Sequence, residues 1–203
     1  SETLTESGAQ ILIVLNGSPY ESDKEDVRLN LAVARVTETG LPLVYVNQVG
    51  GQDELVFDGG SFVLDGDRNL RVQAACWQEE LCISDWSVSS DGHWYCADGE
   101  RASDTKGLEA VYRAMLVGLR DYVDKNGFPG VIIGMSGGID SAMSAVLAVD
   151  ALGADRVRCV RMPSRYSSTH SLNDAEACAD LLGARCDTIP IEDAHRAFES
   201  MLS

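Results

Sequence analysis

V-I-I-G-M-S-G-G-I-D-S, at residues 131–141, determines which architecture can be expected for this chain. Three β-branched residues at 131–133 predict a buried strand without polar alternation. A turn of small residues follows, and residues 139–152 are apolar on nearly every helical turn before Gly153, which predicts a helix with a glycine C-cap. A strand, a glycine-rich turn and a helix direct free backbone N–H groups and the positive end of the helix at one point. The stretch therefore predicts a phosphate-binding turn.

Asp140 makes this prediction more specific, because a carboxylate repels phosphate unless a divalent cation lies between them. The turn thus indicates a nucleotide with Mg²⁺. The alternative is an ordinary strand-to-helix turn in which Ser136 or Asp140 caps the helix. A Walker A loop is excluded because its lysine is missing, and the dinucleotide pattern G-x-G-x-x-G is missing too. The S-G-G-x-D-S pattern resembles the pyrophosphatase loop of ATP-dependent adenylylating enzymes, where the loop holds the leaving pyrophosphate.

The composition excludes several classes of partner. The chain has 203 residues and 45% hydrophobic content, enough for one large or two small domains. Its net charge of −16 argues against nucleic acid and anionic membranes, which require basic surface. Six cysteines without zinc-like spacing indicate buried thiols of a cytosolic protein, and we find no signal peptide or apolar run long enough to span a membrane. The chain starts without methionine and ends within a helical pattern, so we expect a piece of something longer with exposed apolar edges.

The first half of the chain predicts one helix among several strands. The expected elements are a strand at 10–15, a helix at about 24–39 that Gly40 ends, and strands at 41–47, 55–57, 60–64 and 70–74. Gly50-Gly51 is interpreted as a turn, and residues 65–67 as a hairpin turn. Residues 84–105 are rich in Ser, Asp and Gly and predict a linker. Because it contains Trp86, Trp94 and Tyr95, we expect it to pack against a domain.

The second half alternates helices and strands. A helix is predicted at 104–126, followed by the strand and helix described first, then by strands at 156–162 and 185–189 and helices at 172–182 and 192–202. Ser171 with Asp174 resembles a capping box for the helix at 172–182. Such alternation predicts a parallel sheet with right-handed crossovers, which binds ligands at the carboxyl ends of its strands.

Three stretches resemble glutamine-dependent NAD⁺ synthetases. M-P-S-R-Y-S-S at 162–168, followed by S-L-N-D-A at 171–175, is similar to the segment after the second strand of the synthetase domain. N-G-S-P-Y at 16–20 with Lys24, and the run at 47–64, resemble the later part of the nitrilase-type glutaminase domain. The resemblance implies an α/β fold: a partial nitrilase-like α-β sandwich, then a partial parallel-sheet domain of the Rossmann-like adenine-nucleotide alpha hydrolase type. The implied ranges are 1–83 for the glutaminase part, 84–105 for the linker and 106–203 for the synthetase part.

The resemblance also implies a reaction with two sites. One domain hydrolyses glutamine, and the other adenylylates the nicotinate carboxylate of deamido-NAD with MgATP. Ammonia then displaces AMP to give NAD. The expected protein is a cytoplasmic ligase and a homo-oligomer, with ATP, deamido-NAD and glutamine as small-molecule substrates and with no nucleic acid or membrane partner.

The family pattern assigns roles to individual residues. Asp140 is assigned to Mg²⁺, and Ser18 and Lys24 are assigned to glutamine. A hydroxyl and an ammonium group suit the carboxylate and amino ends of a free amino acid. The alternative for Ser18 is an ordinary turn residue. The alternative for Lys24, Arg161 and Arg165 is a solvated surface charge. The residues assigned to ATP are Gly134, Met135, Ser136, Gly137, Gly138, Ile139, Asp140, Ser141, Arg161, Met162 and Arg165.

The chain departs from the family at the glutaminase centre. The family's Glu, Lys and nucleophilic Cys lie before the N-G-S-P-Y turn, where this chain has only residues 1–9. Cys76 follows that turn and is interpreted as a structural thiol. We therefore expect no glutaminase activity from these residues, and no complete synthesis of NAD. One alternative is another ligase with a pyrophosphatase loop, such as a GMP synthetase, an asparagine synthetase or a tRNA-modifying enzyme. The other is a non-catalytic nucleotide-binding fragment.

Overall fold

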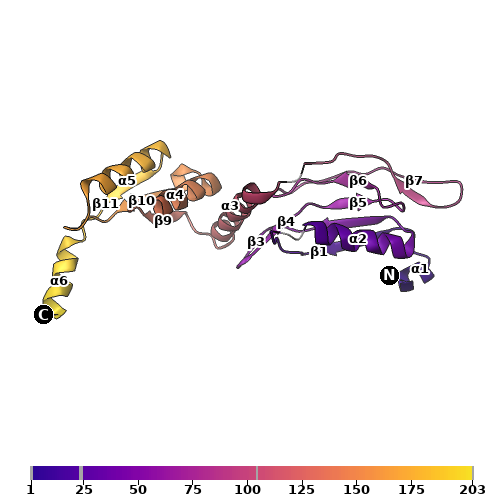
Figure 1. The fold of residues 1–203 in the computed structure, drawn as a ribbon, viewed down its shortest axis with the longest axis horizontal. Helices are drawn as coiled ribbons and strands as arrows, with labels where there is room; N and C mark the ends of the chain where they lie inside the picture. The colour runs from indigo at the N-terminus through magenta and orange to yellow at the C-terminus, as the bar shows by residue number, and fades with distance from the viewer. Residues whose placement is uncertain (1, 23–24, 104, 203) are drawn as a thin grey trace. The chain divides into compact units, whose positions relative to one another are not determined.

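The computed structural model describes residues 2–22, 25–103 and 105–202, and it divides the chain into two compact units, Ser1–Gly118 and Leu119–Ser203 (Figure 1). The division falls inside one long helix, α3 (Gly107–Lys125). Each unit has its own hydrophobic core, so each is described by itself.

The first unit is built on a mixed four-stranded sheet in the order β1-β2-β5-β6. The strands are β1 (Leu12–Asn16), β2 (Leu43–Asn47), β5 (Phe62–Leu64) and β6 (Leu70–Gln73). β1 and β2 are parallel, whereas β2, β5 and β6 are antiparallel neighbours. The helix α2 (Glu25–Thr39) buries Ala32 and Val36 against Leu43 and Leu64. Apolar residues at alternate strand positions thus form a core on one face of the sheet.

The other sheet face is partly covered by the segment predicted as a linker. Within it, β7 (Trp86–Val88) and β8 (Trp94–Cys96) form an antiparallel hairpin. Trp86 and Cys96 pack against Val63 and Val72 of the sheet, as the aromatic content of this segment led us to expect. The hairpin itself was not predicted, because its polar strands lack a hydrophobic period.

A second hairpin corrects the prediction of a turn at Gly50-Gly51. Both glycines lie within β3 (Val49–Gln52), which pairs antiparallel with β4 (Leu55–Asp58). The turn lies at Asp53, whose φ is 52°. Asp tolerates this left-handed conformation better than most residues, so it can make the turn while the glycines remain in the strand. The short helix α1 (Glu2–Glu6) was likewise not predicted.

The second unit is built on a parallel sheet, as predicted, whose three strands are β9 (Val131–Gly134), β10 (Val157–Arg161) and β11 (Arg185–Thr188). The strand order, which was not predicted, is β11-β10-β9 (Figure 1). Helices α4 and α5 bury Ala145, Ala148, Ala175 and Ala179 against Cys159 of the central strand. Small side chains let both helices approach the sheet closely. The other elements are α4 (Ile139–Leu152), the short 3-10 helix η1 (Ala154–Arg156), α5 (Thr169–Leu181) and α6 (Glu192–Leu202).

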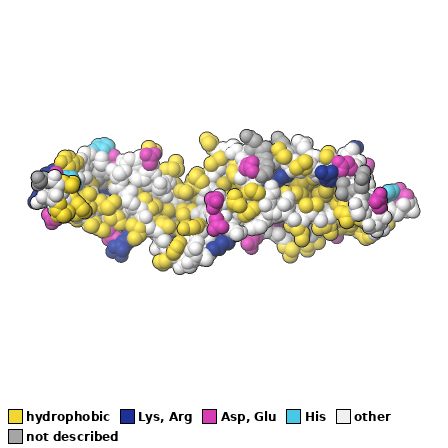
Figure 2. All heavy atoms as spheres, turned by 90° about the horizontal axis from the view of Figure 1, so that it is seen from below, with side chains coloured by type: hydrophobic (Ala, Val, Ile, Leu, Met, Phe, Trp, Pro, Cys, Tyr) yellow, Lys and Arg dark blue, Asp and Glu magenta, His cyan; other side chains and the backbone are white. Residues whose placement is uncertain are grey.

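The prediction that β9 is a buried strand is wrong, because Val131 and Ile133 are only half-buried and Ile132 and Gly134 are exposed. Ile132 is 72% exposed, and its register partner on β10, Arg158, is exposed as well. The sheet face that carries these two residues is therefore open to solvent, whereas the opposite face packs against the helices. Ile13 and Leu15 of β1 are exposed in the same way in the first unit. Figure 2 shows many hydrophobic side chains at the surface, in agreement with the expected apolar edges.

The ends of the helices test the capping predictions. Gly153 ends α4 with a φ of 85°, and its N–H donates to the carbonyl of Val149. α5 begins earlier than predicted, because Ser168 rather than Ser171 is its N-cap. The Ser168 hydroxyl accepts the Ser171 N–H at 3.1 Å. Ser171 is therefore the residue whose N–H is capped, and the predicted capping box is wrong.

Two further expectations concern the cysteines and the membrane. The six cysteines, all within the described residues, form no disulfide; Cys96 and Cys159 are buried as expected, whereas Cys82 is exposed. Cys76 is half-buried and packs beside Trp77 in a small core formed with α3. None of the helices described here is both long and apolar enough to cross a membrane.

Candidate functional site

The turn after β9 is held by its own serine hydroxyls. Met135 continues the β9 ladder, since its N–H donates to Val160 at 2.8 Å. The Ser136 hydroxyl accepts the Gly138 N–H at 3.2 Å, and the Ser141 hydroxyl donates to the Gly138 carbonyl at 2.9 Å. Gly138 is the N-cap of α4 and provides no side chain to cap it. In the described turn, the first N–H groups of α4 are thus left without a side-chain cap and can meet an anion.

Gly137 brings this turn against the start of α5. Its φ is 78°, and a Cβ at this position would lie 2.1 Å from the carbonyl oxygen of Ser171. No other residue type fits, because both the conformation and the space require glycine. Gly134 is less restricted, since its Cβ would lie 3.2 Å from the Met162 methyl group at the far end of a flexible side chain.

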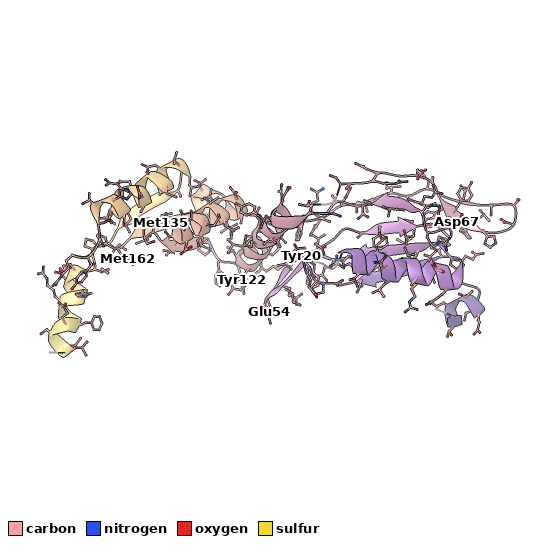
Figure 3. The ribbon with its side chains drawn as sticks, viewed as in Figure 1. Tyr20, Glu54, Asp67, Tyr122, Met135 and Met162 are labelled. Carbon is pink, nitrogen blue, oxygen red and sulfur yellow. The ribbon has the colours of Figure 1, made fainter. Side chains whose placement is uncertain are left out.

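A cavity of about 350 Å³ lies where β9, β10 and α5 meet. Figure 3 labels Met135 and Met162, which reach it from the ends of the two strands. This is the carboxyl edge of the sheet, the edge where parallel sheets bind ligands. The residues that line it are Gly134, Met135, Ser136, Met162, Tyr166, Ser167, Ser168, Ser171 and Leu172.

Four residues assigned to ATP from the sequence line this cavity: Gly134, Met135, Ser136 and Met162. The other residues of the turn, 137–141, follow directly. Five lining residues at 166–168 and 171–172 were not predicted. They lie at the end of β10 and the start of α5, and the rule that ligands bind at the strand ends could have found them.

Asp140 lies in the first turn of α4 and is exposed. Its backbone carbonyl accepts the Ser144 hydroxyl at 2.9 Å. The described residues contain no group of three or more His, Cys, Asp or Glu side chains able to hold a metal ion. A carboxylate oxygen suits Mg²⁺, which binds proteins through one or two carboxylates and takes its other ligands from water and phosphate. Asp140 therefore fits a magnesium ion that arrives with a nucleotide.

Arg161 lies beside the cavity and is engaged with neighbouring elements. Its guanidinium donates to the Leu172 carbonyl at 3.1 Å, to Glu176 at 2.8 Å and to the Thr188 hydroxyl at 2.9 Å. It thereby connects β10 to α5 and β11. Its buried Nε has no hydrogen-bond partner among the described residues, and its assignment to ATP stays a prediction.

Arg165 is held by carboxylates of α6. It donates to Glu192 at 2.7 Å and lies 3.4 Å from Glu199. This guanidinium lowers the pKa of Glu192 from 4.5 to about 2. Because its charge is already paired, Arg165 contributes to the loop beside the cavity through its backbone position. Its assignment to ATP stays a prediction.

The residue assigned to glutamine, Ser18, belongs to a buried polar network in the first unit. The Ser18 N–H donates to the Asn47 side chain at 2.9 Å, and the Ser18 hydroxyl accepts Arg28 Nε at 3.0 Å. Arg28 also forms a salt bridge with Asp58 at 2.7 Å, and their side chains are only 9% and 1% exposed. The network fixes the N-G-S-P-Y turn. Lys24, the second residue assigned to glutamine, lies outside the described residues.

The network could not be predicted residue by residue. Arg28 comes from α2, Asn47 ends β2, and Asp58 ends β4, so only the folded chain brings them together. Trp77 lies beside this network, because its backbone N–H donates to the Asp58 backbone carbonyl at 2.8 Å. Its ring meets the Tyr20 ring edge-on, with 4.9 Å between the ring centroids.

The second unit is, by its fold, an α/β unit with a cavity at the carboxyl edge of a parallel sheet, the edge where such sheets bind ligands. The family comparisons are more specific. Residues 2–94 match the carbon-nitrogen hydrolase family, and residues 111–203 match the NAD synthase family. The predicted α/β fold class, a nitrilase-like part followed by a Rossmann-like part, is thereby confirmed.

Individual relatives match nearly the whole chain. It is 48% identical over 200 residues to the glutamine-dependent NAD(+) synthetase of Rhodobacter capsulatus, covering 98% of this chain and 36% of the relative. The corresponding enzyme of Xanthomonas campestris pv. campestris (strain 8004) is 40% identical over 201 residues, covering 98% and 35%. A structure of glutamine-dependent NAD+ synthetase from Acinetobacter baumannii in complex with ADP matches with a TM-score of 0.88 at 38% identity, covering 99% of this chain and 38% of that one.

The chain thus has the sequence and fold of a segment of glutamine-dependent NAD(+) synthetases, and the resemblance found in the sequence is confirmed. It spans a little over a third of the length of these relatives.

Proposed function

We propose that this chain is part of a glutamine-dependent NAD⁺ synthetase. The proposed reaction is the ATP-dependent, AMP-forming amidation of deamido-NAD, with ammonia derived from glutamine. The observation that carries the proposal is the cavity at the ends of β9 and β10, lined by the turn that precedes α4. The relative from A. baumannii, whose structure is in complex with ADP, supports a nucleotide as the ligand.

The site's residues suit the activation step. A carboxylate is a poor acyl donor, and transfer of AMP to it creates a good leaving group. In that transfer the departing pyrophosphate gains charge, which donors fixed in advance can stabilise. The turn from Ser136 to Ser141 and the first N–H groups of α4 would hold the phosphates. When bound, Mg²⁺ would neutralise part of the negative charge of the phosphates. Asp140 is the residue that would hold the ion.

The lining of the cavity suggests how the nucleotide lies in it. Met162 is half exposed and gives the cavity an apolar surface, whereas Ser167, Ser168 and Ser171 offer hydroxyls. We assign the base to Met162, because flat apolar groups pack well against thioethers. The phosphates then point to the glycine-rich turn, which agrees with the position of Asp140.

The metal role of Asp140 gives a direct test. We expect Asp140→Asn to weaken MgATP binding about tenfold or more, corresponding to at least ~1.4 kcal/mol. ATP without Mg²⁺ should bind the variant at least as tightly as the parent, because the Asp140 carboxylate then only repels the phosphates. Asp155→Asn is the control, since it removes the same charge at the far end of α4. Isothermal titration calorimetry measures ATP binding to the parent and both variants, each with and without Mg²⁺. If Asp140→Asn binds MgATP as tightly as the parent does, Asp140 is not a metal ligand.

The identity of the acceptor is tested in the complete enzyme that contains this chain. We expect AMP release to depend on deamido-NAD and not on xanthosine monophosphate. Release of AMP with xanthosine monophosphate alone would favour the other class of ligase with a pyrophosphatase loop.

The first unit is proposed to contribute to glutamine binding through the turn that contains Ser18, without hydrolysing glutamine itself. The reason is that the family pattern places no nucleophilic cysteine on residues 1–203. We expect a pure sample of these residues to release no ammonia from glutamine above the buffer background in a coupled glutamate dehydrogenase assay. Steady release that an active-site thiol reagent abolishes would contradict this.

We further propose that the protein works in the cytoplasm and as a homo-oligomer. Cysteines that are not joined in disulfides suit a reducing compartment. Light scattering of the complete enzyme would give the mass of the assembly, and a monomer would contradict the second statement.

A further inference from the structure

The segment at 162–168, between β10 and α5, forms one side of the cavity through Met162, Tyr166, Ser167 and Ser168. It is folded into a tight turn of its own. The Ser164 N–H donates to the Ser167 hydroxyl at 3.0 Å, and the Ser167 N–H donates to the Ser164 carbonyl at 3.0 Å. Arg165 lies at the centre of this turn. Whatever holds Arg165 therefore sets the position of the lining residues on both sides of it.

Glu192 holds the backbone as well as the side chain of Arg165. One oxygen of its carboxylate accepts the Arg165 backbone N–H at 2.9 Å, and the other accepts Arg165 Nε at 2.7 Å. Arg196, one turn further along α6, donates at 3.2 Å to the carboxylate oxygen that also accepts Arg165 Nε. Charge-assisted bonds to both oxygens determine orientation as well as contributing energy.

Two neighbouring contacts join the same elements. The Ile191 N–H donates to the Pro163 carbonyl at 3.0 Å, and the ring of His195 meets that of Tyr166 at 5.6 Å. None of the described residues of α6 is buried. The connection between α6 and this part of the cavity thus depends on a few specific contacts, with the Glu192 carboxylate at their centre, and not on a hydrophobic interface.

We propose that Glu192 is a positioning residue for the nucleotide cavity: by holding the Arg165 backbone, it places Met162 and Tyr166 where the nucleotide binds. Glu192 itself does not line the cavity, so it acts through the segment at 162–168. This inference rests on the proposed binding of MgATP in the cavity. It links α6, an exposed helix, to nucleotide affinity.

The test compares Glu192→Ala with Asp193→Ala in the full chain. Both substitutions remove one carboxylate from the first turn of α6, so their effects on net charge and on the helix dipole match. Without nucleotide, we expect the amides of residues 164–168 to exchange with deuterium about tenfold faster in Glu192→Ala, which corresponds to ~1.4 kcal/mol of local stability. Asp193→Ala should exchange like the parent.

Calorimetry then measures MgATP affinity in the same proteins. We expect Glu192→Ala to bind MgATP about five- to tenfold more weakly and Asp193→Ala to bind like the parent. Glu192→Gln, which keeps an acceptor for the Arg165 N–H, should recover part of the affinity. Equal thermal midpoints for the two alanine variants would show that the difference is local.

The outcomes separate the two proposals. Unchanged exchange in Glu192→Ala overturns the inference whatever the nucleotide does, and so does faster exchange with unchanged MgATP affinity. A parent chain that binds no MgATP overturns the proposed function and with it the role of Glu192 in nucleotide binding. Faster exchange and weaker binding together, both confined to Glu192 variants, support the inference.

Discussion

Replacement of Gly137 by alanine is expected to abolish most nucleotide binding by this protein. The new Cβ would lie 2.1 Å from the Ser171 carbonyl oxygen, 2.8 Å from the Ser171 Cα and 2.8 Å from its carbonyl carbon. These are backbone atoms at the start of α5, so a side-chain rotation cannot relieve the overlap. Alanine also disfavours the left-handed conformation by roughly 1–2 kcal/mol.

Either the turn or the start of α5 must move in the Gly137→Ala variant. Both line or adjoin the cavity, so we expect MgATP affinity to fall by roughly 30-fold or more, about 2 kcal/mol. Calorimetric titration measures this directly. Circular dichroism shows whether the second unit keeps its helices at the temperature of the titration.

Gly153→Ala is the matched control. Gly153 has a φ of 85°, close to that of Gly137, but nothing lies within 4 Å of the position of its added Cβ. It ends α4, whereas Gly137 precedes that helix. We expect a loss of about 1 kcal/mol in stability and an unchanged MgATP affinity. Equal losses of affinity in the two variants would mean that general destabilisation, and not the contact with Ser171, explains the effect.

The second large effect is expected in the first unit, where Arg28→Ala removes the partner of a buried carboxylate. Asp58 is 1% exposed, and Arg28 is its salt-bridge partner at 2.7 Å. Loss of one member of a buried pair leaves an uncompensated charge and costs about 3–5 kcal/mol. Arg28 also donates to the hydroxyl and the carbonyl of Ser18, so the N-G-S-P-Y turn should loosen as well.

Urea unfolding followed by tryptophan fluorescence measures this cost, since all three tryptophans lie in the first unit. Arg35→Ala provides the comparison, because Arg35 lies on the same helix and pairs with Glu38 at 2.7 Å in an exposed position. We expect it to cost less than about 0.5 kcal/mol. Adding Asp58→Asn to Arg28→Ala should restore part of the stability by removing the buried charge. Similar costs for Arg28→Ala and Arg35→Ala would contradict the account of the buried network.

The elements of the second unit could largely be predicted because their signals are local. The limits of α4 and α6 agree with the prediction. For α4 the signal is plain, since Gly138 precedes the helix and Gly153 ends it. The hairpin of β3 and β4 was wrongly predicted because Gly50 and Gly51 suggested a turn that Asp53 makes instead. The N-cap of α5 was misplaced because two serines, Ser168 and Ser171, both suit that position and only the packing distinguishes them.

The candidate site was predicted in part for the same reason. Its glycine-rich turn is encoded within eleven consecutive residues, whereas the remaining cavity depends on how α5 meets β10. The pairing of Arg161 with Glu176, and of Arg165 with Glu192, joins residues 15 and 27 positions apart. Sequence spacing alone gives no sign of these pairs, which is why the sequence predicted either a nucleotide contact or a surface charge for both arginines.

The measurement that tests the central claim most directly is hydrogen–deuterium exchange of the full chain with and without MgATP. The cavity at the carboxyl edge of the second sheet predicts slower exchange in residues 134–141 and 162–172 when MgATP is added. The first unit should exchange at the same rate in both conditions. Unchanged exchange in both of those segments at saturating MgATP, or protection confined to Ser1–Gly118, would contradict the claim that this cavity binds the nucleotide.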